Sequence, residues 1–169
     1  MRVKGVCWVG VILLMQQLSA SAASQSSISI SLPSKVEAGN IDPIVVPAEA
    51  VIHGQPIHIE EPFCVYSNDT ENGDYQVTLS GSGQDGAFEL TDGKHRFLYQ
   101  VEYNDENTSQ GYVFVKPTQV LSDQMAGSIP AYPCYVDNAR VRLRIDSDDY
   151  ERLPAGTYTG ALYITVGED

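Results

Sequence analysis

The chain lacks the sequence patterns by which most hydrolases, zinc enzymes and redox proteins are recognised. It contains no G-x-S-x-G, no H-E-x-x-H and no C-x-x-C motif, and these motifs supply a nucleophile, a zinc site and a redox pair respectively. The three histidines are isolated, and His53 and His58 are five residues apart in a β-type region, which predicts opposite strand faces. We therefore predict a protein that is not an enzyme, with no catalytic residue, no metal site and no cofactor. All three histidines, His95 among them, are predicted to be surface residues.

Long apolar runs are also missing, except at the N-terminus. Two positive charges in the first four residues precede an apolar run from Gly5 to Met15, and the small residues Ser19–Ala23 follow with an A-x-A spacing. This order is typical of a secretory signal peptide. The run is shorter than the roughly 20 residues of a membrane-spanning helix, so an uncleaved anchor is the less favoured alternative. We predict a signal peptide over residues 1–23, export of the mature chain and no membrane insertion.

Basic residues are scarce. Acidic residues outnumber them 22 to 10, and the predicted signal peptide holds two of the ten. Such a surface repels nucleic acid and anionic membranes, so neither is a predicted partner. The acidity is interpreted as a contribution to solubility.

Cysteine is scarce too. Of the three, Cys7 lies in the predicted signal peptide, which leaves Cys64 and Cys134. An even pair in an oxidising compartment predicts a disulfide, and closing a loop of about 70 residues contributes about 4 kcal/mol in the chain-entropy model. Two free thiols or a metal site is the alternative, although a metal would need further ligands.

Helical periodicity is almost absent, and alternation with a period of two dominates. Polar and glycine-containing turns separate the alternating runs, which is typical of a sandwich or barrel. The predicted fold is an all-β, immunoglobulin-like β-sandwich of about seven to nine strands, without the core tryptophan, because Trp8 lies in the signal peptide. The predicted strands are 27–32, 55–66, 75–79, 87–90, 96–103, 111–115, 139–145 and 156–166.

Two segments interrupt this pattern. Gln119–Met125 is compatible with one helical turn, and Pro33–Pro47 contains prolines and is predicted to be a loop.

Three further features could indicate a binding or modification site, and we interpret each of them conservatively. The acidic residues from Asp146 to Glu151 lack EF-hand spacing and predict a solvated turn rather than a calcium site. The ten tyrosines predict strand packing rather than a carbohydrate platform, and Asn68 and Asn107 begin glycosylation sequons.

The two ends of the mature chain carry the functional signal. Ser27–Leu32 alternates strictly and stops at Pro33, while a strong strand runs almost to the last residue. An isolated terminal strand is explained if it leaves its own domain and adds to the sheet of another subunit. Until assembly, a chaperone would have to cap the unfilled groove, because exposed strand edges aggregate. The alternative is an edge strand that pairs within its own domain.

The closing segment has a recognisable pattern. Residues 153–166, Leu-Pro-Ala-Gly-Thr-Tyr-Thr-Gly-Ala-Leu-Tyr-Ile-Thr-Val, resemble the "L-x-A-G-x-Y-x-x-x-(apolar)-x-(apolar)-x-V" strand of pilin subunits of bacterial chaperone–usher fimbriae. Those include families with alternate chaperones and the related spore-coat-U-like domains. The motif covers the last tenth of the chain, and the resemblance of the rest is architectural.

The resemblance implies an incomplete immunoglobulin-like sandwich that a donor strand from a neighbouring subunit completes. It divides the chain into a donor segment, 24–33, and a pilin domain, 34–169. It implies a structural subunit, major or minor, of a surface fimbria. The partners would be other pilin subunits in a head-to-tail polymer, a periplasmic chaperone, an outer-membrane usher and a host or surface receptor. The protein would pass through the periplasm to the cell surface.

The same resemblance assigns residues to the two halves of the contact. The donor-strand anchors would be Ile28, Ile30 and Leu32. The groove residues of the C-terminal strand would be Tyr158, Leu162, Ile164 and Val166. A function of another class also fits the sequence, namely a secreted monomeric module that binds carbohydrate or protein through its loops and tyrosines.

Overall fold

A computed structural model describes residues 29–46, 50–127 and 134–169. The predicted signal peptide, residues 1–23, and Ile28 lie outside the described residues. The chain divides into two units, Met1–Leu32 and Pro33–Asp169. In the first unit, residues 29–32 are exposed and form no strand within this chain, so the described part of the predicted strand does not pair as an edge strand of its own domain. An isolated strand lacks the ladder that would stabilise it.

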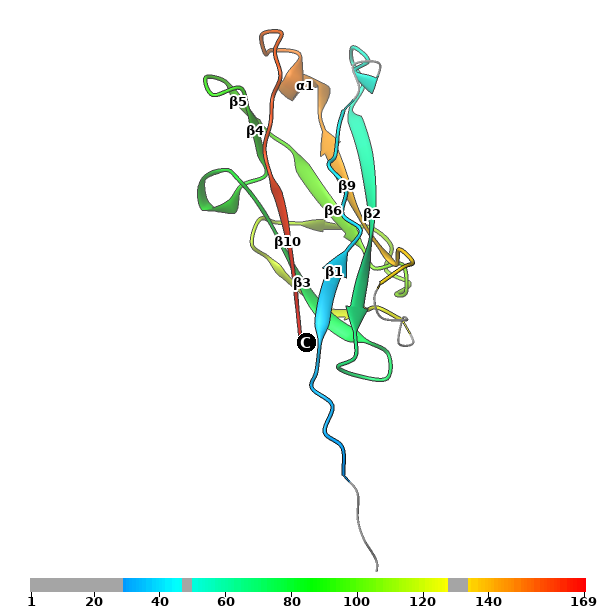
Figure 1. Cartoon of the computed structure of the whole chain (residues 1–169). Helices are drawn as coiled ribbons and strands as arrows, with labels where there is room; N and C mark the ends of the chain where they lie inside the picture. The colour runs from blue at the N-terminus through cyan, green and yellow to red at the C-terminus, as the bar shows by residue number, and fades with distance from the viewer. Residues whose placement is uncertain (1–28, 47–49, 128–133) are drawn as a thin grey trace, which may run out of the picture. The chain divides into compact units, whose positions relative to one another are not determined.

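The second unit consists mainly of antiparallel strands, as predicted. Two sheets and a hairpin are formed (Figure 1). The five-stranded sheet has the order β1 (Val36–Gly39), β2 (Ile57–Ser67), β9 (Ala139–Ile145), β6 (Gln100–Asn104) and β7 (Val113–Val115). The three-stranded sheet has the order β10 (Leu162–Gly167), β3 (Asp74–Gly81) and β8 (Val120–Met125), and the hairpin joins β4 (Glu89–Thr91) to β5 (Arg96–Leu98). Two short helical turns, η2 (Gln84–Gly86) and α1 (Ser147–Tyr150), complete the described elements.

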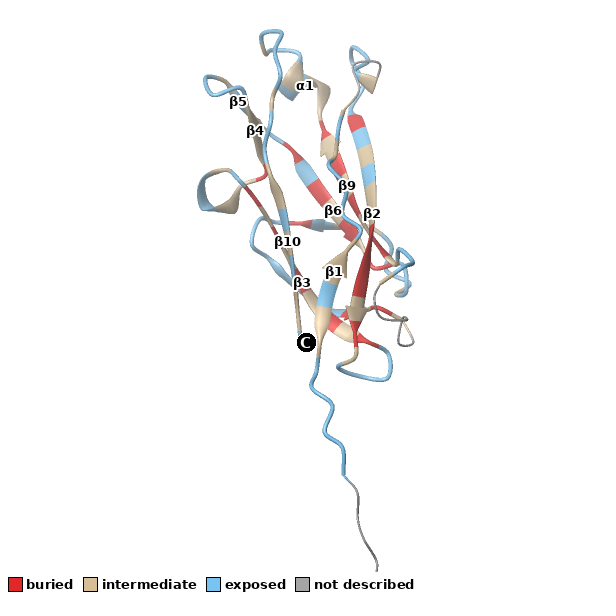
Figure 2. Ribbon diagram, in the orientation of Figure 1, coloured by how far each residue is buried: buried red, intermediate tan, exposed pale blue. Residues whose placement is uncertain are grey.

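Alternation of side chains builds the core. Strands β3 and β9 alternate buried and half-buried residues along their whole length, which is the pattern of a strand with one face inward. The inward faces of both sheets contribute to one hydrophobic core (Figure 2). Within the five-stranded sheet, the rings of Phe63 and Tyr103 are 6.2 Å apart. Across the core, the hydroxyl oxygens of Tyr75 and Tyr103 are 2.5 Å apart.

The predicted disulfide is confirmed. Cys64 on β2 is bonded to Cys134, with 5.7 Å between the Cα atoms. Asn138 continues the link between these segments, because its amide accepts from Val65 N–H at 2.8 Å and donates to Val65 C=O at 2.9 Å. It also donates to Ala126 C=O at 2.8 Å. One side chain thus replaces a strand partner where β9 begins, and it connects the end of β8 to β2.

Four local predictions need correction. Gln119–Met125 holds strand β8 rather than a helical turn, because it pairs with β3, and tertiary pairing overrides a weak local preference. The predicted loop Pro33–Pro47 contains β1, where Val36 packs against the core. The predicted strand Arg96–Tyr103 is divided at Tyr99, whose N–H donates to Phe88 C=O at 3.0 Å. The acidic turn contains α1.

The helices of the described residues are all too short and too polar to cross a membrane.

Candidate functional site

The two lateral edges of the second unit, where the two sheets meet, differ in how their edge strands are connected. At one edge, β7 and β8 follow each other in the chain, and a tight turn between them is held by a hydrogen bond from Gln119 N–H to Lys116 C=O at 3.0 Å. At the other edge, β1 and β10 are each the last strand of their sheet. They lie side by side (Figure 1), yet no ladder joins them within the described ranges. One side of each strand is therefore left without a ladder partner.

An apolar groove opens at this edge. It has a volume of about 940 Å³, near the upper end of the range for ligand pockets. Its floor consists of inward-facing side chains from the five-stranded sheet and the hairpin, namely Ile57, Ile59, Leu90, Phe97, Tyr99, Val141, Leu143 and Ile145. One wall is the segment Ile41–Val46, and the opposite wall is Leu153–Leu162 together with Ile164. The groove therefore reaches the hydrophobic core.

The second wall is held by close contacts of the C-terminal motif. Thr159 forms an isolated bridge with Thr91, with both backbone N···O distances at 2.9 Å. The Tyr158 ring meets Phe97 edge-on at 5.5 Å between centroids, and its hydroxyl donates to Pro154 C=O at 3.0 Å. Desolvation raises the pKa of Tyr158, and the nearby charge of Asp92 adds to the shift. Gly160 lies so near β4 that a Cβ atom would overlap the carbonyl oxygen of Glu89.

The first wall is an irregular segment that follows β1. Asn40 has a φ of +60°, a left-handed value that few residues other than glycine adopt. Beyond it, Ile44 and Val46 pack against the core, whereas Ile41 and Val45 expose 47% and 73% of their surface. From Ile44 to Val46 the wall therefore alternates half-buried and exposed side chains without belonging to a sheet.

The residues assigned by the resemblance are placed as follows. Tyr158, Leu162 and Ile164 line the groove; Val166 packs against the core but does not line the groove. Ile30 and Leu32 each expose 81% of their surface, and Ile28 lies outside the described residues.

The sequence analysis missed the wall Ile41–Val46 as part of the site, and it treated the floor residues as ordinary core. Alternation in Ile57–Ile59 and Val141–Ile145 gives an inward face, but it does not reveal whether the neighbouring strand is missing. The apolar residues of Ile41–Val46, within a predicted loop, were the available signal.

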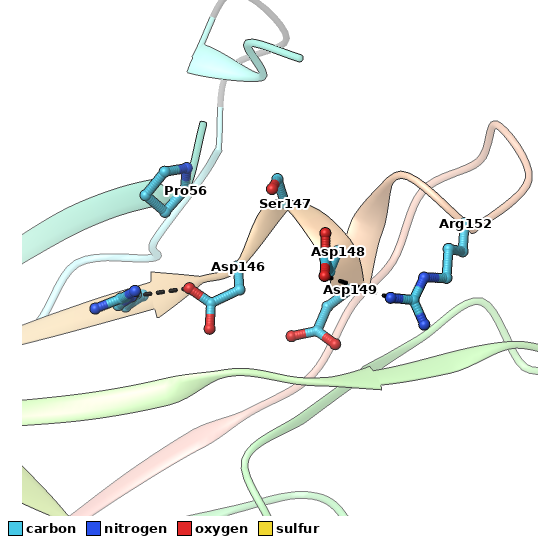
Figure 3. Close-up of a pocket in the computed structure, with 7 residues that line it drawn as sticks. Pro56, Asp146, Ser147, Asp148, Asp149 and Arg152 are labelled. Carbon is cyan, nitrogen blue, oxygen red and sulfur yellow. Dashed lines mark hydrogen bonds and ion pairs between the residues drawn. The ribbon is translucent and has the colours of Figure 1, made fainter. Parts of the chain in front are cut away.

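A second hollow is polar and lies at α1 (Figure 3). It is lined by Pro56, Arg144, Asp146, Ser147, Asp148, Asp149 and Arg152. Asp146 is 2.9 Å from Arg144 and Asp148 is 3.5 Å from Arg152. The described residues hold no group of three or more side chains suited to a metal ion. These arginines balance carboxylates within the hollow, and we assign it no ligand.

Two of the three histidines and both sequon asparagines have structural partners. His53 is 2.8 Å from Glu151 in a turn, not on a strand as expected, and His95 is 3.0 Å from Asp92. His58 is exposed on β2. The sequon amides also make hydrogen bonds. Asn68 accepts from Lys35 N–H at 2.6 Å, and Asn107 donates to Met125 C=O at 3.0 Å.

The face of the five-stranded sheet away from the core carries an ion-pair ladder. Arg142 on β9 lies opposite Glu60 on β2 and Glu102 on β6, at 2.7 Å and 3.2 Å. The hydrogen bond from Arg142 is the main cause that lowers the pKa of Glu60. Such cross-strand pairs contribute about 0.2–1 kcal/mol each. The ladder therefore helps to fix the register of the strands that form the groove floor.

No protein-family model, no curated protein and no solved structure matches this chain significantly.

Proposed function

We propose that the mature chain is a structural subunit of a surface fimbria, assembled by donor-strand exchange. The observation that carries the proposal is the apolar groove between Ile41–Val46, which follows β1, and Leu153–Leu162, which leads into β10. It opens at the edge where no ladder joins the two sheets within the described residues. In this proposal the second unit is an immunoglobulin-like sandwich that lacks one strand. The N-terminal segment of a neighbouring subunit supplies that strand.

The N-terminal segment has the chemistry that the groove requires. Ile28, Ile30 and Leu32 are separated by two residues each, so in an extended strand they point to one face at intervals of about 6.7 Å. The serines between them point to the opposite face, toward water. The exposure of Ile30 and Leu32, 81% each, leaves both side chains free to be buried elsewhere.

The energies are of the right size for stable association. Burial of each anchor contributes about 1.5–3 kcal/mol, and backbone hydrogen bonds with the free edge of β10 add to this. Association costs roughly 4–15 kcal/mol in lost freedom, so three anchors together with a strand ladder are needed, and one anchor is insufficient. Because the donor and the groove are different surfaces, the contact is heterologous and the polymer is open-ended.

The cellular setting follows from the same features. A disulfide between Cys64 and Cys134 fits an exported protein. An unfilled groove exposes apolar core and a strand edge, which favours aggregation. We therefore include a periplasmic chaperone that fills the groove during transit and an outer-membrane usher at which the strands exchange, with a cell-surface fimbria as the destination.

The test compares polymerisation of the mature chain with that of two donor-segment variants, each made with the chaperone. Ile28→Asp/Ile30→Asp/Leu32→Asp places charges on the anchor face and is expected to give folded monomers. The matched control, Ser29→Asp/Ser31→Asp, places charges on the other face and is expected to polymerise. Size-exclusion chromatography and electron microscopy measure the outcome.

Deletion of Ser24–Leu32 should also give a folded monomer, and a deletion variant that still polymerises contradicts the proposal. A second contradictory result is a stable monomer, with an intact β spectrum, from the unmodified mature chain made without any chaperone. That result would favour the monomeric binding module.

A further inference from the structure

We propose that residues Ile41–Val46 are a latent strand, which becomes ordered as the second hydrogen-bonding edge of the groove when the N-terminal segment of another copy binds. The inference rests on the proposed function, and it concerns the wall of the groove opposite β10. It assigns a role in binding to a segment that belongs to no sheet of the described structure.

The register of β1 already extends into this segment. Gly39 is opposite Cys64, and continuation of that register places Asp42 opposite Glu61. The N–H of Asp42 donates to the side chain of Glu61, at 2.8 Å from Oε1, so a side-chain hydrogen bond holds the segment beside β2 where no ladder does. Residues 41–46 therefore follow the edge of β2 in phase with β1, although they do not pair with it.

The side chains keep the same phase. Val36 and Ala38 on β1 pack against the core, and so do Ile44 and Val46, which are displaced from them by even numbers of residues. In a strand, residues at even separations share a face. The segment thus presents the inward face of a strand without having the hydrogen bonds of one.

Specific backbone features keep the strand from forming. Asn40, at a φ of +60°, turns the chain away at the end of β1. Pro43, and Pro62 opposite Ile41 in the continued register, have no N–H to donate, so a regular ladder with β2 is interrupted on both strands. The remaining backbone groups of the segment can be paired from the side of the groove, and a strand bound there between Ile41–Val46 and β10 supplies partners.

Amide hydrogen exchange tests the ordering. The mature chain carrying Ile28→Asp, Ile30→Asp and Leu32→Asp cannot fill a groove with its own segment, and a synthetic peptide of residues 24–33 serves as the probe. On saturation with the peptide, the amides of Ile44 and Val46, at alternate positions of the segment as one edge of a ladder requires, are expected to exchange at least tenfold more slowly. The amides of Gly93 and Lys94, in the turn between β4 and β5, are the control and should not change.

Peptide binding, measured separately by fluorescence anisotropy, distinguishes failure of the latent strand from failure of the proposed function. If the peptide binds and slows exchange in β10 while residues 41–46 are unaffected, the latent strand is wrong and the proposed function stands. If the peptide does not bind at all, both are wrong.

A matched pair of variants tests the same wall by affinity. Val46 is half-buried against the core, whereas Val136 is 74% exposed and does not line the groove. Val46→Ser is expected to weaken peptide binding roughly tenfold, whereas Val136→Ser should change it less than twofold. Tighter binding by Val46→Ser would overturn the inference, because the segment would then compete with the peptide instead of pairing with it. The exchange measurement uses unmodified residues 41–46, so it remains decisive if Val46→Ser does not fold.

Discussion

At the scale of single residues, the two glycines of the C-terminal motif have different roles. A Cβ atom at Gly160 would overlap the Glu89 carbonyl oxygen and lie 2.9 Å from Leu90 Cδ2. A Cβ atom at Gly156 would meet nothing nearer than Tyr158 Cε2 at 3.8 Å. The first glycine therefore permits close approach of the groove wall to β4, and the second is free of this constraint.

We predict that Gly160→Ala lowers the free energy of unfolding by about 1–3 kcal/mol, the usual cost of forcing extra volume into a packed site. The wall would have to move away from Glu89. Gly156→Ala is the matched control and should cause no loss, because replacing an unconstrained glycine restricts mainly the unfolded chain. Urea unfolding of both variants measures the difference, and equal stabilities would show that the contact at Gly160 is not tight.

At the scale of elements, a pair of tyrosines links the two sheets. Tyr75 on β3 and Tyr103 on β6 are fully buried, and their hydroxyl groups share a hydrogen bond. Burial is the main cause that raises the pKa of both hydroxyls, and burial also raises the pKa of Tyr99 to about 12. The contact between these sheets therefore depends on neutral phenols.

We predict that stability falls as the pH rises above about 10, the pKa of tyrosine in an unfolded chain. The folded pKa values are higher, so above pH 10 the unfolded state releases protons that the folded state retains. Each such tyrosine lowers the free energy of unfolding by up to about 1.4 kcal/mol per pH unit. Denaturant unfolding between pH 7 and pH 11.5 measures this slope.

The double variant Tyr75→Phe/Tyr103→Phe should reduce the slope and leave only the contribution of Tyr99 among the three buried tyrosines. Its stability at pH 7 should change little, since replacing both partners of a buried hydrogen bond by apolar groups of similar shape is nearly neutral. Tyr163→Phe, at a side chain that is 55% exposed, is the control. An unchanged slope in the double variant would contradict the assignment.

At the scale of the whole molecule, long-range links hold a unit whose two sheets are unpaired at one edge. The disulfide joins residues 70 positions apart, and Asn138 connects the same region to the end of β8 through Ala126. Both links lie outside the groove lining. They can therefore stabilise the unit whether or not a strand fills the groove.

We predict that Cys64→Ala/Cys134→Ala lowers the free energy of unfolding by about 2–5 kcal/mol, the range for loss of a native disulfide. The unfolded chain gains the freedom of a loop of about 70 residues. Urea unfolding of the oxidised protein and the variant measures the loss, with the reduced unmodified protein as the control. A loss below about 1 kcal/mol would show that the remaining contacts suffice.

Local patterns in the sequence determined the all-β character, most strand positions and the disulfide. An alternating run such as Ala139–Ile145 buries one face in any sheet, and an even pair of cysteines after a predicted signal peptide favours a disulfide. The tertiary structure decided what depends on neighbours distant in the sequence. It made Val36–Gly39 and Val120–Met125 strands, because β2 and β3 offered partners.

The groove could not be read from the sequence for the same reason. Leu162 and Ile164 have the same alternation whether a strand lies beside them or not, because alternation reports the buried face and not the hydrogen-bonding edge. Only the order of strands in each sheet leaves β1 and β10 without a common ladder, and the core opens at this edge between residues 41–46 and 153–164.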